Sequence, residues 1–340
     1  MQITARKLPD RFLIVPNLEE FFGEVRNREN GLDLIDTHRY ADVADIYLSR
    51  LGTIGFTFMD SGPLASIDRL ETTGSGAVPE YVMQNHDDVV ELQGRRIIFA
   101  NFIAGAIFGH LAALRHSAMS GAQYAGMDEI LAFTVSGAQL HIEHSKYAAA
   151  VLNPKIRLVR EEPARMRIVT DEQRAAALSF LDHIADRHSA FESVDLQACM
   201  VMNYQAAILH NEQHAAASLA LNFSVAEALI DEIFRVYGLL GIATPKPFAT
   251  RGHTVAPVSN TQFARWKLQN KIEALANGKL IATSLNQRLE DARKLRNGLM
   301  HRAAAVTVRQ SGEMQTTVRD LWTLLLDQPF ELAAAWSMRI

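Results

Sequence analysis

The chain has 340 residues, of which 48% are hydrophobic and 21% are charged, and its formal net charge is -4 at pH 7. This is the composition of an ordinary globular protein with enough apolar residues for a sizeable core, and the length favours about two domains. The negative balance excludes a general basic surface, so a nucleic-acid partner would have to be bound at a local site. The single cysteine excludes an intramolecular disulfide.

Two segments of the sequence indicate where in the cell the protein is expected. The first ten residues, MQITARKLPD, lack the uninterrupted apolar stretch of a secretory signal. The run IIFANFIAGAIFGHLAAL is nearly long enough to cross a membrane, and Gly105 and Gly109 have GxxxG spacing. Asn101 and His110 lie inside this run, and no second candidate span exists. We therefore expect a buried helix, no membrane association and a cytoplasmic protein.

Residues 1–165 have a mixed pattern. The runs RFLIVP and IGFTFM are typical of short strands, whereas RYADVADIYLSRL has the apolar spacing of a helix. The stretch LNPKIRLVREEPARMRIVTDEQ combines prolines with dense charge and indicates a domain boundary. We predict two domains, over residues 1–165 and 166–340. The function of the N-terminal domain is unknown, and a sensor or regulatory role is one possibility.

The second domain is expected to be helical nearly throughout. Its first helix starts at Asp171 with Thr170 as N-cap, and a long stretch after residue 194 breaks near residues 211–213. Further helices are predicted over residues 261–276, from Ser284 to at least His301 with Gln287 at capping-box spacing, and over residues 318–336. The predicted fold class is mainly α: a helical bundle preceded by a mostly helical domain with a few short strands.

The sequence RNGLMH, residues 296–301, carries the main candidate chemistry. Asn297 and His301 are four residues apart and share a helix face, with Arg293 one turn earlier on the same line. Gly298 leaves room for the close approach of another backbone or of a phosphate. A guanidinium binds two phosphate oxygens, and imidazole transfers protons near neutral pH. Because the 2′-hydroxyl of RNA is an internal nucleophile, these groups suit phosphodiester cleavage without a metal.

These six residues are similar to the R-x4-6-H signature of the HEPN superfamily, in the frequent form with Asn directly after Arg. Upstream, in NFSVAEALIDEIF, Glu227 falls against the apolar stripe of its helix, whereas Asp231 points elsewhere. HEPN domains have such an acidic residue near the motif arginine, so the resemblance implies that Glu227 pairs with Arg296. It covers about residues 171–336.

The resemblance implies an up-and-down bundle that dimerises with its two motifs facing each other, forming one metal-independent endoribonuclease site without a cofactor. Arg296 would bind and stabilise the phosphate, His301 would transfer the proton, and Asn297 would orient one of them or the substrate. Arg293 and Arg302 are surface charges or contacts to RNA phosphates. Such proteins commonly are toxins or act against phage, with an antitoxin or an activating ligand as partner. The Tyr that some toxin members carry after the His is absent from HRAAAV.

Two other functions are open. In a non-catalytic binding module, Arg296 and Glu227 would form a structural ion pair. In a metal-dependent phosphohydrolase, histidine clusters of the N-terminal half would bind the ion. The candidate clusters are HIEH, with His141, Glu143 and His144, and NHDD, with His86 and Asp87; HNEQH further along places His210 and His214 four apart. No stretch has the pattern of a phosphate-binding Walker loop or of a serine hydrolase.

Overall fold

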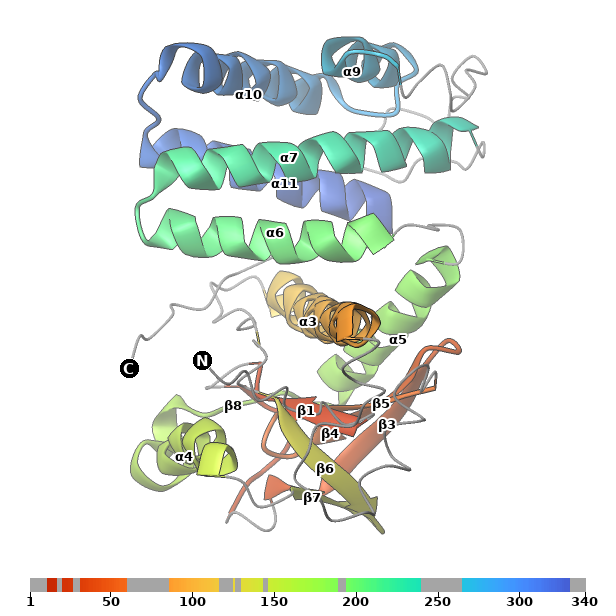
Figure 1. Ribbon diagram of the computed structural model, residues 1–340, viewed down its shortest axis with the longest axis vertical. Coiled ribbons are helices and arrows are strands. Elements are labelled where there is room, and N and C mark those ends of the chain that lie inside the picture. The colour runs from red at the N-terminus through yellow and green to blue at the C-terminus, as the bar shows by residue number, and fades with distance from the viewer. Residues whose placement is uncertain are drawn as a thin grey trace. The chain divides into compact units, whose positions relative to one another are not determined.

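The computed structural model describes residues 11–16, 20–26, 31–59, 86–115, 125, 130–142, 146–188, 194–239 and 265–330. The chain divides into two compact units (Figure 1). The first holds Met1–Ala104 and Gln123–Asp182, and the second holds Gly105–Ala122 and His183–Ile340. The helices α3 (His86–Arg115) and α5 (Asp171–His188) each contribute to both units. The domain boundary at residues 165–166 stays a prediction.

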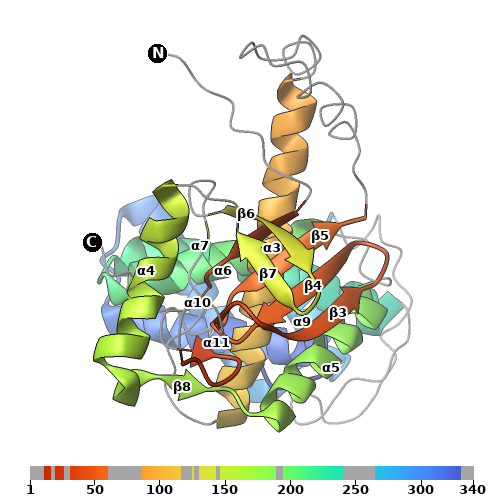
Figure 2. The ribbon, with the colours of Figure 1, turned by 90° about the horizontal axis from the view of Figure 1, so that it is seen from below.

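The first unit contains a six-stranded antiparallel sheet with the strand order β3-β4-β5-β1-β6-β7 (Figure 2). Its strands are β1 (Arg11–Ile14), β3 (Leu34–Tyr40), β4 (Ala44–Ser49), β5 (Ile54–Phe58), β6 (Leu131–Ser136) and β7 (Gln139–Ile142). A separate parallel pair joins β2 (Glu20–Phe21) to β8 (Arg167–Ile168). The helix α4 (Lys146–Glu161) and the short 3-10 helix η4 (Pro163–Arg165) complete the unit.

The sheet curls until its two edges meet at one end. An isolated bridge joins Asp33, just before β3, to Gln139 at the start of β7. Next to it, the backbone N–H of Leu34 donates to the carbonyl of Ala138 at 2.8 Å. Because an unpaired edge strand exposes a row of backbone groups, this contact between the edges protects part of both strands.

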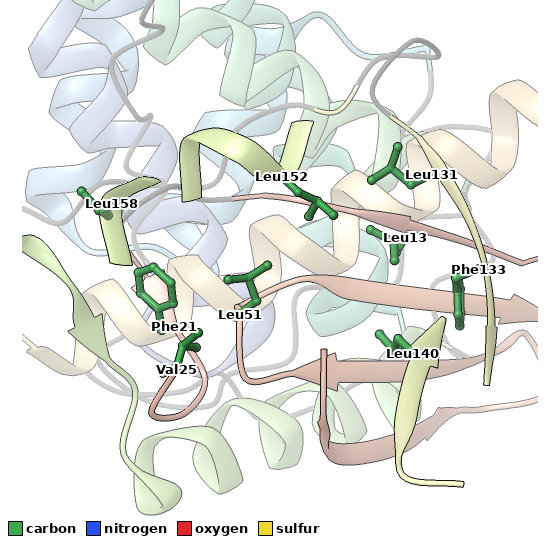
Figure 3. Packing of buried hydrophobic residues seen from close by; sticks show 9 residues of the cluster. All are labelled: Leu13, Phe21, Val25, Leu51, Leu131, Phe133, Leu140, Leu152 and Leu158. Atoms are coloured by element: carbon green, nitrogen blue, oxygen red, sulfur yellow. The ribbon is translucent and has the colours of Figure 1, made fainter. Parts of the chain in front are cut away.

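The curled sheet encloses an apolar core. Figure 3 shows the residues of this cluster, which come from strands, loops and α4: Leu13, Phe21, Val25, Leu51, Leu131, Phe133, Leu140, Leu152 and Leu158. The ring of Phe133 lies so close to Gly55 of β5 that an added Cβ would come within 2.9 Å of it. The glycine therefore lets a strand pass directly over an aromatic ring.

The sheet corrects the predicted fold class. The chain is mixed α/β, and the expectation of a mainly α protein with a mostly helical N-terminal domain was wrong. The two strands predicted from RFLIVP and IGFTFM are confirmed as β1 and β5. The helix predicted from RYADVADIYLSRL was wrong, because these residues form the end of β3 and all of β4. In β4 burial alternates with the two-residue period of a strand, and β5 supplies its pairing partners.

A buried lysine ties three parts of the first unit together. Lys155 of α4 is fully buried, and its Nζ donates to the backbone carbonyls of Glu20, at 2.5 Å, and Leu51. The same nitrogen lies 4.3 Å from the ring centroid of Phe21. Burial lowers the pKa of Lys155 to about 7, against an opposing effect of Glu20.

Polar groups in the apolar helix α3 are satisfied within the protein. In the first unit, the Asn101 amide donates to the carbonyls of Ile97 and Ala125, and its oxygen accepts from the N–H of Ala125 at 2.8 Å. In the second unit, His110 Nδ1 lies 3.0 Å from the carbonyl oxygen of Pro329. Burial lowers the pKa of His110. The predicted buried helix therefore has partners for both of its interior polar side chains.

The glycines of α3 are explained by close packing inside the second unit. A Cβ added at Gly105 would lie 3.1 Å from the sulfur of Met200, and one at Gly109 would lie 2.6 Å from the ring of Phe330. Among the described residues, Gly94–Leu114 is the one segment long and apolar enough to cross a membrane, and 83% of it is buried. This burial agrees with a soluble protein, whereas a cytoplasmic location stays a prediction.

The second unit is a helical assembly. Its helices are α6 (Val194–Asn211), α7 (Ala215–Ile233), the π-helical η5 (Phe234–Leu239), α9 (Leu268–Asn277), α10 (Thr283–Arg302) and α11 (Val308–Leu326). Helix α7 packs against α6, α10 and α11, and these four helices lie side by side in Figure 1. The turn from α6 to α7 and the connection from α10 to α11 lie at the same end of the assembly.

Several predicted helix ends can be compared with the structure. Helix α5 starts at Asp171, and Thr170 Oγ1 accepts from the N–H of Gln173 at 3.2 Å, which confirms the N-cap. The break near residues 211–213 is also confirmed. The capping box at Ser284 was wrong, since α10 starts one residue earlier without a side-chain cap.

The last helix starts ten residues earlier than predicted, at Val308. Thr307 and Gln310 form a complete capping box there. Residues 331–336 of the predicted helix lie outside the described residues, as do residues 261–264 of the helix predicted over residues 261–276.

Candidate functional site

The RNGLMH motif occupies the last two turns of α10. Arg296 and Asn297 are partly buried, whereas His301 and Arg302 are exposed. The helix ends at Ala303, which adopts a left-handed conformation with φ of 48°, and its N–H donates to the carbonyl of Gly298. The motif therefore lies on a helix that reaches His301, as predicted, and its histidine is accessible to solvent.

Arg296 rests on an aromatic ring of the neighbouring helix. Its guanidinium carbon lies 5.6 Å from the ring centroid of Phe223, a buried residue of α7. At this distance the ring attracts the cation. Nη1 of Arg296 also donates to Oδ1 of Asn297, at 3.4 Å. Phe223 and Asn297 thus hold the guanidinium without neutralising its charge.

The arginines of α10 differ in how they are paired. Arg288 forms an ion pair with Asp320 at 2.6 Å, and Arg293 forms one with Glu290 at 2.8 Å. Within the described part of the chain, Arg296 has no ion pair with a carboxylate. Its charge is therefore available to an external anion, whereas that of Arg293 is engaged inside the protein.

Glu227 lies within electrostatic reach of Arg296, one helical turn after Phe223 on α7. Burial raises the pKa of Glu227, and the Arg296 charge acts against this rise. No direct ion pair joins the two side chains among the described residues. Glu227 and Arg296, the two predicted partners, thus interact electrostatically without a direct ion pair.

Two further charged residues belong to this group and were missed in the sequence. Asp231 raises the pKa of Glu227 and Lys271 lowers it. Lys271, from α9, donates to both carboxylate oxygens of Asp231 at 2.7 and 2.8 Å. Phe223, Glu227 and Asp231 are spaced by four residues and so lie along one line of α7. Asp231 is exposed, as expected of a residue that points away from the apolar stripe of this helix.

The end of α10 exposes apolar as well as polar side chains. Met300 is 59% exposed, and Val308, at the start of α11, is 44% exposed. A Cβ added at Gly298 would meet Ala304 at 3.5 Å and Arg302 at 3.7 Å, which are ordinary contacts. Gly298 is itself buried, and these two residues already lie against the position of an added Cβ, so the room that we expected this glycine to leave for a backbone or a phosphate stays a prediction.

His210 is engaged in a chain of hydrogen bonds. Its Nδ1 lies 3.1 Å from Ser311 Oγ, which donates to Ser218 Oγ at 2.9 Å, and Ser218 Oγ donates to the Ala206 carbonyl at 2.8 Å. This chain joins α6, α7 and α11. It gives Nδ1 of His210 a hydrogen-bond partner within the helical assembly.

Among the residues described here, no group of three His, Cys, Asp or Glu side chains could hold a metal ion. Glu143 and His144 lie outside the described residues, and the side chains of His86 and Asp87 are likewise not described.

Comparison of the chain with family models, with curated proteins and with solved structures found no match. The assignment of a function therefore rests on the residues of α7, α9 and α10 and on their geometry.

Proposed function

We propose that the second unit is a metal-independent endoribonuclease of the HEPN type, which cleaves RNA through attack by the 2′-hydroxyl. The observation that carries this proposal is the state of Arg296: its guanidinium has no ion pair with any described carboxylate and is held on Phe223, on the same two turns of helix as the exposed His301. A guanidinium that is held in place and not bound by a carboxylate can bind two oxygens of a phosphate.

In this reaction Arg296 binds the scissile phosphate and stabilises the charge that develops on its oxygens. A base takes the proton of the 2′-hydroxyl, the 2′-oxygen attacks phosphorus, and the bond to the 5′-oxygen breaks. The leaving oxygen receives a proton, which yields a 2′,3′-cyclic phosphate and a 5′-hydroxyl. His301 is the proton-transfer group. Asn297 orients Arg296, and Glu227 holds it electrostatically.

The angle between the two main residues supports a site made by two copies of the chain. Arg296 and His301 are five residues apart, so their side chains leave the helix about 140° from each other. One copy therefore does not aim both groups at the same phosphate, whereas a second copy could place its His301 opposite Arg296. The exposed Met300 and Val308 provide apolar area for such a contact.

The biological setting proposed for this activity is that of a toxin or phage-defence effector. RNA is the substrate, and an antitoxin or an activating ligand acting through the N-terminal part of the chain is the proposed regulator. Arg302 is a proposed contact to RNA phosphates. Arg293 is a weaker candidate for this role, because its charge is engaged by Glu290.

Cleavage of end-labelled RNA in the presence of EDTA tests the proposal. Wild type, Arg296→Ala and His301→Ala are compared, with Lys294→Ala as a control from the same helix, because Lys294 forms only an exposed pair with Asp291. We expect cleavage by the wild type and the control and a large loss in the other two. Absence of cleavage by the wild type, alone and with candidate activating ligands, would favour the non-catalytic binding module. Cleavage only with added metal would redirect attention to the histidine clusters.

A further inference from the structure

The chain that leaves α11 lies across apolar parts of the second unit. Helix α11 ends at Leu326, and Asp327 turns the chain with a φ of 55°. We call residues 327–330 the C-terminal strap. Its last residue, Phe330, is 2% exposed and packs against Trp322 of α11, with 5.9 Å between the ring centroids. The same ring lies against Gly109 of α3. The C-terminal strap therefore covers apolar parts of two helices.

Two histidines from other helices hold the backbone of this turn. His183 of α5 donates from Nε2 to the carbonyl of Leu326 at 2.6 Å. His110 of α3 donates from Nδ1 to the carbonyl of Pro329 at 3.0 Å. A carbonyl oxygen can only accept, so each imidazole must carry a proton on the nitrogen that faces the chain. Imidazole is also the side chain whose charge changes between about pH 5 and 8, so the turn is held by groups that can respond to pH.

His110 is the histidine on which a charge costs more. It is 5% exposed, and burial lowers its pKa from the ordinary value of 6.5; the bond to Pro329 opposes this effect and the charge of His183 adds to it. His183 is the titratable group that acts on His110 from α5, and the C-terminal strap carries Asp327, two residues before Pro329. A charged His183 lies at the C-terminal end of α11, where the helix dipole favours a cation.

Acid should therefore favour an open strap. If the C-terminal strap lifts, His110 loses the Pro329 carbonyl and meets water, so its pKa returns toward 6.5. The open state then binds more protons than the closed state between the lowered pKa and 6.5. By linkage, each pH unit lost within this window raises the ratio of open to closed molecules by up to about tenfold. Above the window the closed state keeps its full advantage.

We propose that the C-terminal strap is an acid-sensitive latch: neutral His110 holds the Pro329 carbonyl, and protonation of His110 beside His183 releases the strap and uncovers the rings of Phe330 and Trp322. The latch uses no residue of the RNGLMH motif, so it does not depend on the proposed ribonuclease function. Its sensor is on α3, and the element that moves is the chain after α11.

Hydrogen exchange of the full chain, followed by mass spectrometry from about pH 7.5 to about pH 5 and corrected for the intrinsic effect of pH on exchange, tests the latch. His110→Asn keeps a donor at the position of Nδ1 but cannot be protonated. His214→Asn is the matched control, because His214 is exposed. Thr323→Val removes a bond that does not titrate, from Thr323 Oγ1 to the carbonyl of Phe330 at 3.3 Å.

In the wild type we expect the protection of residues 322–330 to fall by up to about tenfold per pH unit below pH 6.5, while that of α7 stays constant. His110→Asn should lose this dependence and His214→Asn should keep it. Thr323→Val should be less protected at every pH, with the wild-type slope. Protection that does not change with pH, or a wild-type response in His110→Asn, would overturn the inference. An equal loss in α7 would also overturn it, because acid would then unfold the whole helical assembly.

An NMR titration of His110 in the wild type tests the same inference without relying on the folding of a variant. The midpoint should lie below 6.5. It should move up toward 6.5 in His183→Gln, which keeps a donor at the position of Nε2 but removes the neighbouring charge. A wild-type midpoint at or above 6.5 would overturn the latch, since the closed strap would then favour the charged imidazole.

Discussion

Arg296 of α10 lies over the ring of Phe223 of α7, 5.6 Å from guanidinium carbon to ring centroid. This contact joins two helices that are far apart in the sequence and fixes the direction of the one motif residue best suited to bind phosphate. The other arginines before it on α10, Arg288 and Arg293, are engaged by carboxylates. Among the residues that the structure describes, Arg296 differs from these two arginines in having no ion pair with a carboxylate.

Gly298→Ala should leave the protein as stable as the wild type or more stable. The new methyl group makes ordinary contacts, and alanine favours a helix over glycine by about 1 kcal/mol. Thermal unfolding measures the change. A lower melting temperature would contradict the observed packing. Loss of RNA cleavage in a stable variant would show that the glycine admits a partner or substrate from outside the chain.

Gly109→Ala should destabilise the protein by about 1–3 kcal/mol, the usual cost of overpacking a core. The added Cβ would lie 2.6 Å from the ring of Phe330, which is buried in the second unit. Gly94→Ala is the control from the same helix, because a Cβ there meets nothing within 4 Å. Denaturant unfolding compares the two variants, and equal stabilities would refute this explanation of the glycine pair.

The stability of the protein should depend on the ionisation of Lys155. Burial lowers its pKa to about 7, below the unfolded value of 10.5, so the native chain binds fewer protons than the unfolded chain between these values. The free energy of unfolding therefore rises with pH across this window, by up to about 1.4 kcal/mol per pH unit from this group.

The variant Lys155→Met has no ionisable group at this position, so the difference between wild type and variant gives the pH-dependent contribution of Lys155 to stability. The neutral amine retains two N–H groups, enough for the carbonyls of Glu20 and Leu51. The stability of wild type relative to Lys155→Met should thus increase as the pH rises from about 7 to about 10. A difference that stays constant with pH would contradict the lowered pKa.

Neutral His210 should carry its proton on Nδ1. Ser218 donates to a carbonyl and Ser311 donates to Ser218, so the Ser311 oxygen is left to accept from the imidazole. Long-range proton–nitrogen NMR of the histidine side chains identifies the tautomer, with the exposed His214 for comparison. Ser311→Ala should remove the preference. A proton found on Nε2 would show that the hydrogen-bond chain runs in the other direction.

Local chemistry made part of the fold predictable. The cap at Thr170 and the break after Asn211 depend on neighbouring residues, and both were found in the sequence. The Thr307–Gln310 capping box had the same kind of local signal, and it was overlooked because the following turns of α11 are polar. Residues 44–49 were misread because their register depends on β5 and cannot be derived from their own spacing.

In the candidate site, too, some features follow from the local sequence and others depend on how the helices pack. The helical spacing of Arg296, Asn297 and His301 follows from the sequence alone, and the structure keeps it. The position of Arg296 over Phe223 and the ion pair between Lys271 and Asp231 depend on how α7, α9 and α10 pack, which no local pattern records. The four-residue spacing of Phe223, Glu227 and Asp231 was a local signal that they lie along one line of α7, and it was overlooked.

The most direct test of the central claim uses one RNA oligonucleotide and the same oligonucleotide with 2′-O-methyl groups, both incubated with the wild type, Arg296→Ala and His301→Ala in EDTA. The account predicts that only the wild type cuts, only the unmodified RNA is cut, and the products end in a 2′,3′-cyclic phosphate and a 5′-hydroxyl. Cleavage of the methylated strand, or undiminished cleavage by either variant, would contradict it.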